Sequence, residues 1–231
     1  MGELILCSHP IAAMPYYIDN ISLNVYSLEE LCYYIENHLY LIEADFMSEE
    51  LCLWIGQELD EKDLAQSLRS VLLGNGSLSD FTELILRSCG YCSEDTIRHI
   101  RSVLLDMQNK SVFECSKIRA DRYMESEKYV KAIHEYRKLL GMEEECKKNP
   151  VLEGNIRHNL GTACAELFLF DEAAANFLNA YRLNQNRESL AACMAACRLA
   201  KKTDILKKYK EEFHVSDEAF KSMSDQWNSV L

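Results

Sequence analysis

The cysteines are the residues whose spacing most directly suggests chemistry. Cys89-Gly-Tyr-Cys92 is a Cys-x-x-Cys motif in a chain that has ten cysteines. At a helix N-terminus that follows a β-strand, such a motif has one thiol of lowered pKa, which thiol–disulfide exchange exploits. Here the preceding residues, Leu84–Arg87, have a helical pattern instead. We therefore expect a helix–turn–helix junction in which Gly90 ends the first helix, and thiol redox chemistry at Cys89 and Cys92 is an alternative function.

Other motifs for metal binding or catalysis are scarce. A zinc site would need two more ligands near the cysteine pair, and His99 is the nearest candidate in the sequence. The sequence has no second Cys-x-x-Cys, no glycine-rich phosphate loop and no Gly-x-Ser-x-Gly motif. The remaining isolated histidines have no evident acidic or nucleophilic partner in the sequence: His9, His38, His134 and His214. We therefore expect no catalytic residue, no metal and no cofactor.

Charge is unevenly divided along the chain. Residues 1–110 contain 6 Lys/Arg and 18 Asp/Glu, whereas residues 111–231 contain 19 of each. Nucleic-acid binding requires a basic surface that displaces counterions, so we do not expect it here. No apolar run approaches the roughly 20 residues of a membrane span. The chain also opens with Glu3 rather than with the basic segment of a secretory leader, which predicts a cytoplasmic protein with reduced thiols.

Only 3 Pro and 8 Gly occur in 231 residues, and this scarcity of breakers favours helices. The exception is at the start, where the β-prone runs Tyr16–Ile18 and Ile21–Tyr26 flank Asp19–Asn20. This pair tolerates the positive φ angles of a tight turn, so we expect a small β-hairpin over residues 16–26. Five helices are expected to follow and to form an acidic N-terminal domain over residues 1–110. Four of them begin at polar N-caps, namely Ser27, Ser48, Ser77 and Ser93.

A pattern of small and large residues occurs twice in the second half. Counted from Ala120, the offsets 3, 12, 16 and 19 fall on Tyr123, Ala132, Tyr136 and Leu139. Counted from Gly161, the same offsets fall on Cys164, Ala173, Phe177 and Ala180. A small residue in each helix of a pair lets the two helices approach closely, and the large residues fill the space beside the crossing.

This order of residues resembles the tetratricopeptide repeat, a helical hairpin of about 34 residues. The two anchors are 41 residues apart, and the surplus falls in the connection Gly141–Gly154. The resemblance covers residues 113–183 clearly and 187–231 loosely, and it does not extend to residues 1–110. A third, degenerate hairpin is expected at Leu190–Ala200 and Ile205–Phe213. Its expected anchor is Ala195, with Lys207 and Glu211 at the small and aromatic offsets, and a capping helix is expected from Ser216 to Trp227.

The expected fold is therefore all-α. It consists of a helical domain over residues 1–110, followed by an α–α superhelix, or solenoid, of hairpins over residues 111–231.

The resemblance implies that the first helices of the hairpins line a concave groove that binds an extended peptide or a helix. The residues expected in this groove are Lys117, Asp121, Asn155, His158, Thr162 and Glu166. One subset of the family holds acidic chaperone tails with a clamp of lysines, asparagines and an arginine. Lys117 and Asn159 match this clamp. Asp121, Ser189 and Cys193 do not, and the Asp121 carboxylate would repel an acidic ligand, so we expect no such clamp.

The leading hypothesis is a non-enzymatic scaffold that binds a partner protein or peptide through the groove. One alternative is a regulator whose hairpins sense a short signalling peptide while the acidic domain binds an effector. The other is the thiol redox protein at Cys89 and Cys92.

Overall fold

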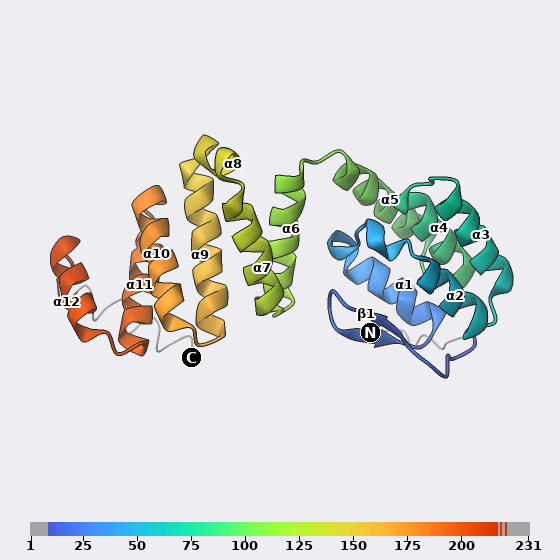
Figure 1. The fold of residues 1–231 in the computed structure, drawn as a ribbon, viewed down its shortest axis with the longest axis horizontal. Coiled ribbons are helices and arrows are strands. Elements are labelled where there is room, and N and C mark those ends of the chain that lie inside the picture. The colour runs from blue at the N-terminus through green and yellow to red at the C-terminus, as the bar shows by residue number, and fades with distance from the viewer. Residues whose placement is uncertain (1–8, 217, 219, 221–231) are drawn as a thin grey trace. The chain divides into compact units, whose positions relative to one another are not determined.

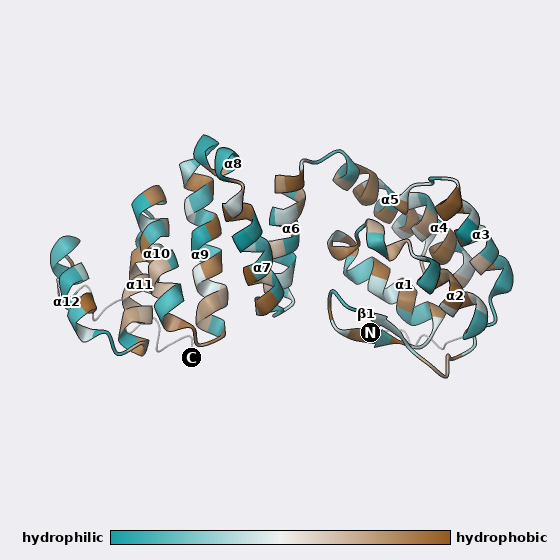
Figure 2. Ribbon diagram, viewed as in Figure 1, coloured by the Kyte–Doolittle hydropathy of each residue, from teal (hydrophilic) through white to brown (hydrophobic). Residues whose placement is uncertain are grey.

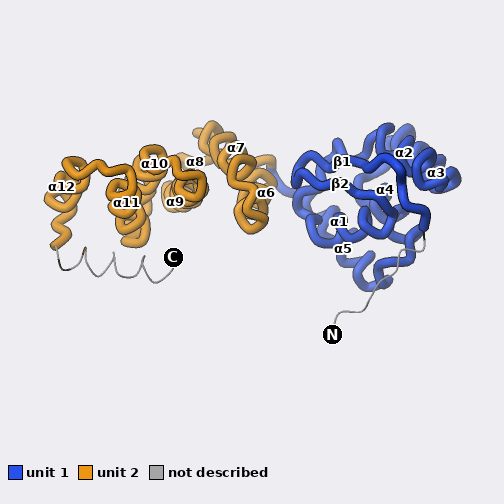
Figure 3. The backbone as a smooth tube through the Cα atoms, turned by 90° about the horizontal axis from the view of Figure 1, so that it is seen from below, with its two compact units in different colours: residues 1–111 blue, residues 112–231 orange. Residues whose placement is uncertain are grey.

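The computed structural model describes residues 9–216, 218 and 220, and over these residues the chain is all-α apart from one small β-hairpin. The chain divides into two compact units, residues 1–111 and 112–231, one residue beyond the expected boundary (Figure 3). The elements of the first unit are β1 (Tyr16–Ile18), β2 (Leu23–Val25), α1 (Leu28–Asn37), η1 (Leu39–Leu41), η2 (Ala44–Phe46), α2 (Glu49–Gln57), α3 (Lys62–Leu73), α4 (Leu78–Cys89) and α5 (Glu94–Gln108). Those of the second unit are α6 (Val112–Glu125), α7 (Tyr129–Gly141), α8 (Glu143–Lys148), α9 (Pro150–Glu166), α10 (Phe170–Asn184), α11 (Arg187–Leu199) and α12 (Thr203–Glu212). No helix among the described residues is both long enough and apolar enough to span a bilayer.

The expected β-hairpin is present, but its turn differs from the predicted one. The strands are antiparallel with Ile18 opposite Leu23, so residues 19–22 form the loop. Ser22 adopts the positive φ angle of 56°, and neither Asp19 nor Asn20 does. The Asn20 side chain instead donates hydrogen bonds to the Tyr34 hydroxyl (2.6 Å) and the Leu41 carbonyl oxygen (2.8 Å). Asn20 therefore anchors the loop through its side chain rather than through its backbone conformation.

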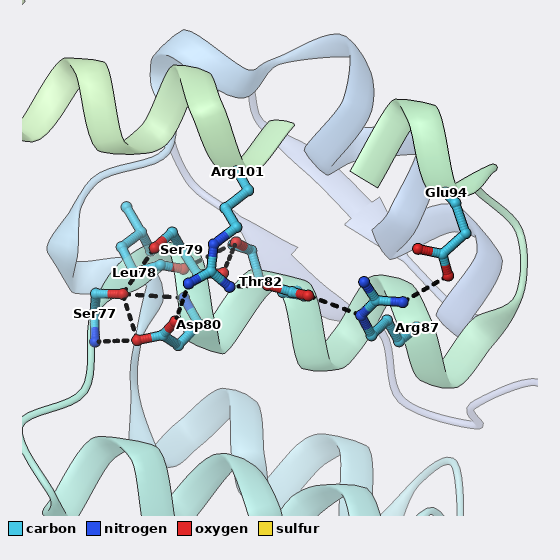
Figure 4. Close-up of polar contacts among 9 residues, drawn as sticks. Ser77, Leu78, Ser79, Asp80, Thr82, Arg87, Glu94 and Arg101 are labelled. Atoms are coloured by element: carbon cyan, nitrogen blue, oxygen red, sulfur yellow. Dashed lines mark hydrogen bonds and ion pairs between the residues drawn. The ribbon is translucent and has the colours of Figure 1, made fainter. Parts of the chain in front are cut away.

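Four helices of the first unit, α1, α2, α4 and α5, begin at the predicted caps, because each serine side chain accepts a hydrogen bond from the backbone N–H three residues later. Helix α3 begins after Glu61, whose side chain makes no such bond. The capping box is complete at Ser77 and Asp80 (Figure 4). At Ser27 it is not, because the Glu30 carboxylate accepts from the N–H of Tyr26 instead. Figure 4 also shows how Arg101 on α5 forms ion pairs with acidic side chains on α4, which link the two neighbouring helices at their partly exposed side.

The second unit is a row of helical hairpins in chain order (Figure 1). The hairpins are α6–α7, α9–α10 and α11–α12, and each of these helices contacts the next one along the chain. All ten positions of the twofold sequence pattern are buried. Gly161 is needed for this packing, because a Cβ atom there would lie 2.8 Å from the ring of Phe177. The small residues therefore permit the close helix approach that the pattern predicts.

The three hairpins share one turn geometry. The residues in the left-handed region are Glu127, Phe168 and Lys201, with φ of 57°, 60° and 58°. In each hairpin the N–H of the next residue donates to the carbonyl five positions earlier, namely Lys128 to Tyr123 (2.8 Å), Leu169 to Cys164 (2.9 Å) and Lys202 to Cys197 (2.9 Å). The three hairpins of the second unit thus repeat one another down to a single backbone hydrogen bond.

These turns correct the register expected for the third hairpin. Its turn lies 33 residues after that of the second, not 34, so Cys197 corresponds to Cys164. The anchor equivalent to Gly161 is therefore Met194, which is fully buried, and not Ala195. The small and aromatic offsets move correspondingly, from Lys207 and Glu211 to Leu206 and Lys210. Helix α12 still has no buried residue and is largely hydrophilic (Figure 2), as expected of a degenerate unit.

The connection between the first two hairpins is helical rather than open. Helix α8 occupies residues 143–148 of it, and Pro150 begins α9, a position where a missing backbone N–H costs little. The surplus residues of the 41-residue spacing are thus accommodated by α8 and an earlier start of α9. The expected capping helix from Ser216 to Trp227 lies outside the described residues apart from 216, 218 and 220, as does Glu3 near the start.

Candidate binding site between the helical hairpins

Side chains from the first two hairpins line a pocket of about 370 Å³. The lining residues are Asp121, Met124 and Glu125 on α6, Tyr136 on α7, and His158, Asn159 and Thr162 on α9. Three residues expected in a groove, Asp121, His158 and Thr162, therefore meet at one place. Six of the seven lining side chains have a polar group, and the walls belong to two consecutive hairpins.

Asp121 is the centre of a hydrogen-bond network in this pocket. Its carboxylate accepts from the Lys117 ammonium (2.6 Å), the Tyr136 hydroxyl (2.7 Å) and the Asn159 amide (3.4 Å). The Asn159 amide also lies 3.3 Å from the Tyr136 hydroxyl. Burial, together with the neighbouring Asp121 carboxylate, raises the pKa of Tyr136, so its hydroxyl remains a donor. The network joins α6, α7 and α9, and hence the first hairpin to the second.

His158 makes the corresponding link to the third hairpin. Its Nδ1 atom lies 2.9 Å from the Ser189 hydroxyl on α11, and its ring lies 5.2 Å from that of Phe177. Burial lowers the pKa of His158, and the negative charge of Glu188 opposes this only in part. The imidazole of His158 is therefore neutral at pH 7, and it lines the pocket as an uncharged side chain.

Of the other expected groove residues, Thr162 lines the pocket, whereas Asn155, Glu166 and Lys117 do not. Thr162 donates to the carbonyl oxygen of His158 (3.2 Å), within α9. Asn155 accepts from the Asn184 amide (3.0 Å) across the α9–α10 pair, away from the pocket. Glu166 is exposed at the end of α9 and does not line the pocket. The Lys117 ammonium is already bound by Asp121, which further weakens any likeness to a clamp for acidic tails.

Two pocket residues, Tyr136 and Asn159, are not among the predicted groove residues. Asn159 is predicted only as a match to the clamp for acidic chaperone tails. Tyr136 was placed in the core by its repeat position, and it is indeed fully buried. Its hydroxyl was the available signal, because a buried tyrosine oxygen needs a hydrogen-bond partner. The partners are Asp121 on α6, which accepts from the Tyr136 hydroxyl, and Asn159 on α9, whose amide donates to it.

The Cys-x-x-Cys motif lies at the expected helix–turn–helix junction. Cys89 is the last residue of α4, and Gly90 follows with φ of 66°. A helix C-terminus does not stabilise a thiolate, and burial with the nearby Glu36 raises the pKa of Cys92 to about 11. The Cys32 thiol of α1 donates to the carbonyl oxygen of Ile85 (3.9 Å), one turn before Cys89, and this neighbouring thiol lowers the pKa of Cys89. Cys89 therefore has Cys32 as a neighbour in addition to Cys92, and His99 is exposed on α5.

His9, which has no evident partner in the sequence, has one in the structure. Its Nδ1 atom lies 2.9 Å from the Glu29 carboxylate, and its backbone N–H donates to the same oxygen (3.2 Å). The Glu29 hydrogen bond raises the pKa of His9. Twenty residues separate the two in sequence, and no local motif connects them.

Comparison with known proteins gives no relative from which a function could be transferred: no family model, curated protein or solved structure matches the chain significantly.

Proposed function

We propose that the second unit binds an extended segment of another protein across the pocket between its first two hairpins. The observation that carries this proposal is the pocket itself, whose walls come from α6, α7 and α9 and whose side chains mostly have polar groups. A row of hairpins presents equivalent helices on one side, and the resemblance to tetratricopeptide repeats associates that side with peptide binding.

The chemistry of the pocket defines the kind of segment. Asp121 and Asn159 are held in place by each other and by Tyr136, so they form a pre-organised polar wall. Preorganisation lowers the entropy cost of binding. Two carboxylates, Asp121 and Glu125, disfavour an acidic ligand. The favoured ligand is a polar segment that donates hydrogen bonds from its backbone or from a basic side chain, and the protein acts as a scaffold rather than as an enzyme.

A peptide-display selection on the full-length protein tests this proposal. Thr162 lines the pocket, so Thr162→Tyr should fill it and weaken the selected peptides by about tenfold or more, which is at least about 1.4 kcal/mol. Asn179→Tyr is the matched control, because Asn179 is exposed on α10 and outside the pocket. Circular dichroism establishes that both variants are folded.

Enriched peptides that lose affinity for the Thr162→Tyr variant alone support the proposal. Selection of no peptide, or of peptides that bind both variants as well as they bind the unmodified protein, contradicts it.

A further inference from the structure

The first unit contains a second polar cluster, whose members come from three distant parts of the chain. His9 precedes β1, Glu29 lies in the first turn of α1, and Cys89 ends α4. The Nδ1 or Nε2 atom of His9, a carboxylate oxygen of Glu29 and the Sγ atom of Cys89 all lie within 4.8 Å of one another. Nitrogen, oxygen and sulfur donors of these types are the protein ligands of transition metals.

The spacing of these donors is close to that of a metal site. Around a tetrahedral metal with bonds of about 2.0–2.3 Å, the ligand atoms are separated by roughly 3.3–3.8 Å. Side-chain adjustments of about 1 Å would therefore bring the three donors to bonding distance. The hydrogen bonds from His9 already hold one oxygen of Glu29 toward the imidazole.

Two of the three donors, Glu29 and Cys89, are buried, which distinguishes this cluster from a chance grouping of side chains on the surface. Glu29 is only 6% exposed and Cys89 only 9% exposed. A glutamate is seldom this buried unless it is paired or binds a metal, because removing its charge from water is costly. The imidazole of His9 compensates for part of that cost, and a divalent cation would compensate for more.

Cys32 supplies a fourth donor. It lies three residues after Glu29 on α1, so the two side chains share one helix face. It is fully buried, and its thiol lies 3.9 Å from the carbonyl oxygen of Ile85 on α4. Ile85 lies one turn before Cys89 on the same face of that helix. With Cys32 beside it, the His9–Glu29–Cys89 cluster therefore has one nitrogen, one oxygen and two sulfur donors within reach.

We propose that His9, Glu29, Cys32 and Cys89 form a structural zinc site. Zn²⁺ accepts imidazole, carboxylate and thiolate ligands in a tetrahedral arrangement, and sites with four protein ligands stabilise folds rather than catalyse reactions. Mg²⁺ and Ca²⁺ require oxygen ligands and do not fit this donor set. Zinc here would fasten the segment before β1 to α1 and to the α4–α5 junction.

Titration of the reduced full-length protein with Zn²⁺, and separately with Co²⁺ as a spectroscopic probe, tests the site. We expect one Zn²⁺ per chain, a rise in melting temperature with Zn²⁺ but not with Mg²⁺, and a Co²⁺ spectrum with tetrahedral ligand-field and thiolate charge-transfer bands. Glu29→Gln and Cys89→Ser should each weaken Zn²⁺ binding by about tenfold or more. Cys92→Ser is the matched control, because Cys92 is three residues away and is not among the four ligands, and its affinity should be unchanged.

Three results would overturn the proposal: no Zn²⁺ bound by the unmodified protein, Zn²⁺ affinity unchanged in Glu29→Gln and Cys89→Ser, or loss of binding in Cys92→Ser. If Cys89→Ser does not fold, the near-isosteric Glu29→Gln variant still decides the question. Its melting temperature in Zn²⁺ should rise less than that of the unmodified protein.

Discussion

At the scale of single residues, the distance between α9 and α10 depends on a glycine. Gly161 faces the buried ring of Phe177, and no side chain fits between them. Gly161→Ala should therefore destabilise the protein by about 1–2 kcal/mol, because overpacking outweighs the better helix propensity of alanine. Urea unfolding measures the change.

Gly141→Ala is the control for Gly161→Ala, because the second unit has space for a methyl group at position 141. Gly141 ends α7, and a Cβ atom there would meet nothing within 4 Å. We expect this variant to be neutral or more stable by up to about 1 kcal/mol. Equal effects of the two substitutions would contradict the close approach at Gly161.

His158 gives the second unit a stability that depends on pH. Burial holds its folded-state pKa below the ordinary 6.5, so the unfolded chain binds the proton more readily. The contribution of neutral His158 to the free energy of unfolding is fully present above about pH 6.5. It is lost as the pH falls through the lowered folded-state pKa of His158. On going from about pH 7.5 to about pH 5.5, the melting temperature of the His158→Gln variant should fall less than that of the unmodified protein. An identical fall in both proteins would show that His158 is not the group responsible.

At the scale of elements, the common hairpin turn places three residues other than glycine in the left-handed region. Phe168 is 78% exposed, so its side chain contributes little burial to offset this conformation. Phe168→Gly and Lys201→Gly should each stabilise the protein by about 0.5–1 kcal/mol, because glycine adopts positive φ without steric cost. Thermal unfolding measures this. The control Ala175→Gly, within α10, should cost about 1 kcal/mol. Destabilisation by the two turn substitutions would contradict the turn geometry.

The sequence predicted most elements because their signals are local. N-cap serines, the buried small residues at repeat offsets and the stop at Gly90 each depend on a few neighbouring residues. The prediction of the β-hairpin turn was wrong because the Asn20 side chain donates a hydrogen bond to Tyr34. That contact joins residues 14 positions apart, so no local pattern indicates it. The register of the third hairpin was wrong by one residue because the family's 34-residue period was applied to a 33-residue spacing. Helix α8 was missed because it is one short helix of mostly charged residues.

At the scale of the whole molecule, the chain consists of two units that each have their own core. We expect fragments of residues 1–111 and 112–231 to fold separately, with helical circular dichroism spectra that sum to that of the full chain. An unfolded fragment 112–231 would contradict the description of that unit as a self-supporting helical repeat.

The sequence predicted part of the candidate site. The repeat register placed Asp121, His158 and Thr162 on one side of the helices, and they do line one pocket. The repeat register could not show that Asp121 and His158 also join neighbouring hairpins, because those bonds connect residues 38 and 31 positions apart. The His9–Glu29–Cys89 cluster was beyond local patterns for the same reason.

The most direct measurement of partner binding is site-specific photo-crosslinking in the cell of origin. A photoreactive amino acid replaces Thr162 in one variant and Asn179 in the other. If the pocket between the first two hairpins holds a segment of another protein, Thr162 should give one discrete crosslinked species that Asn179 does not. No adduct at Thr162, or the same adducts from both positions, would contradict binding at this pocket.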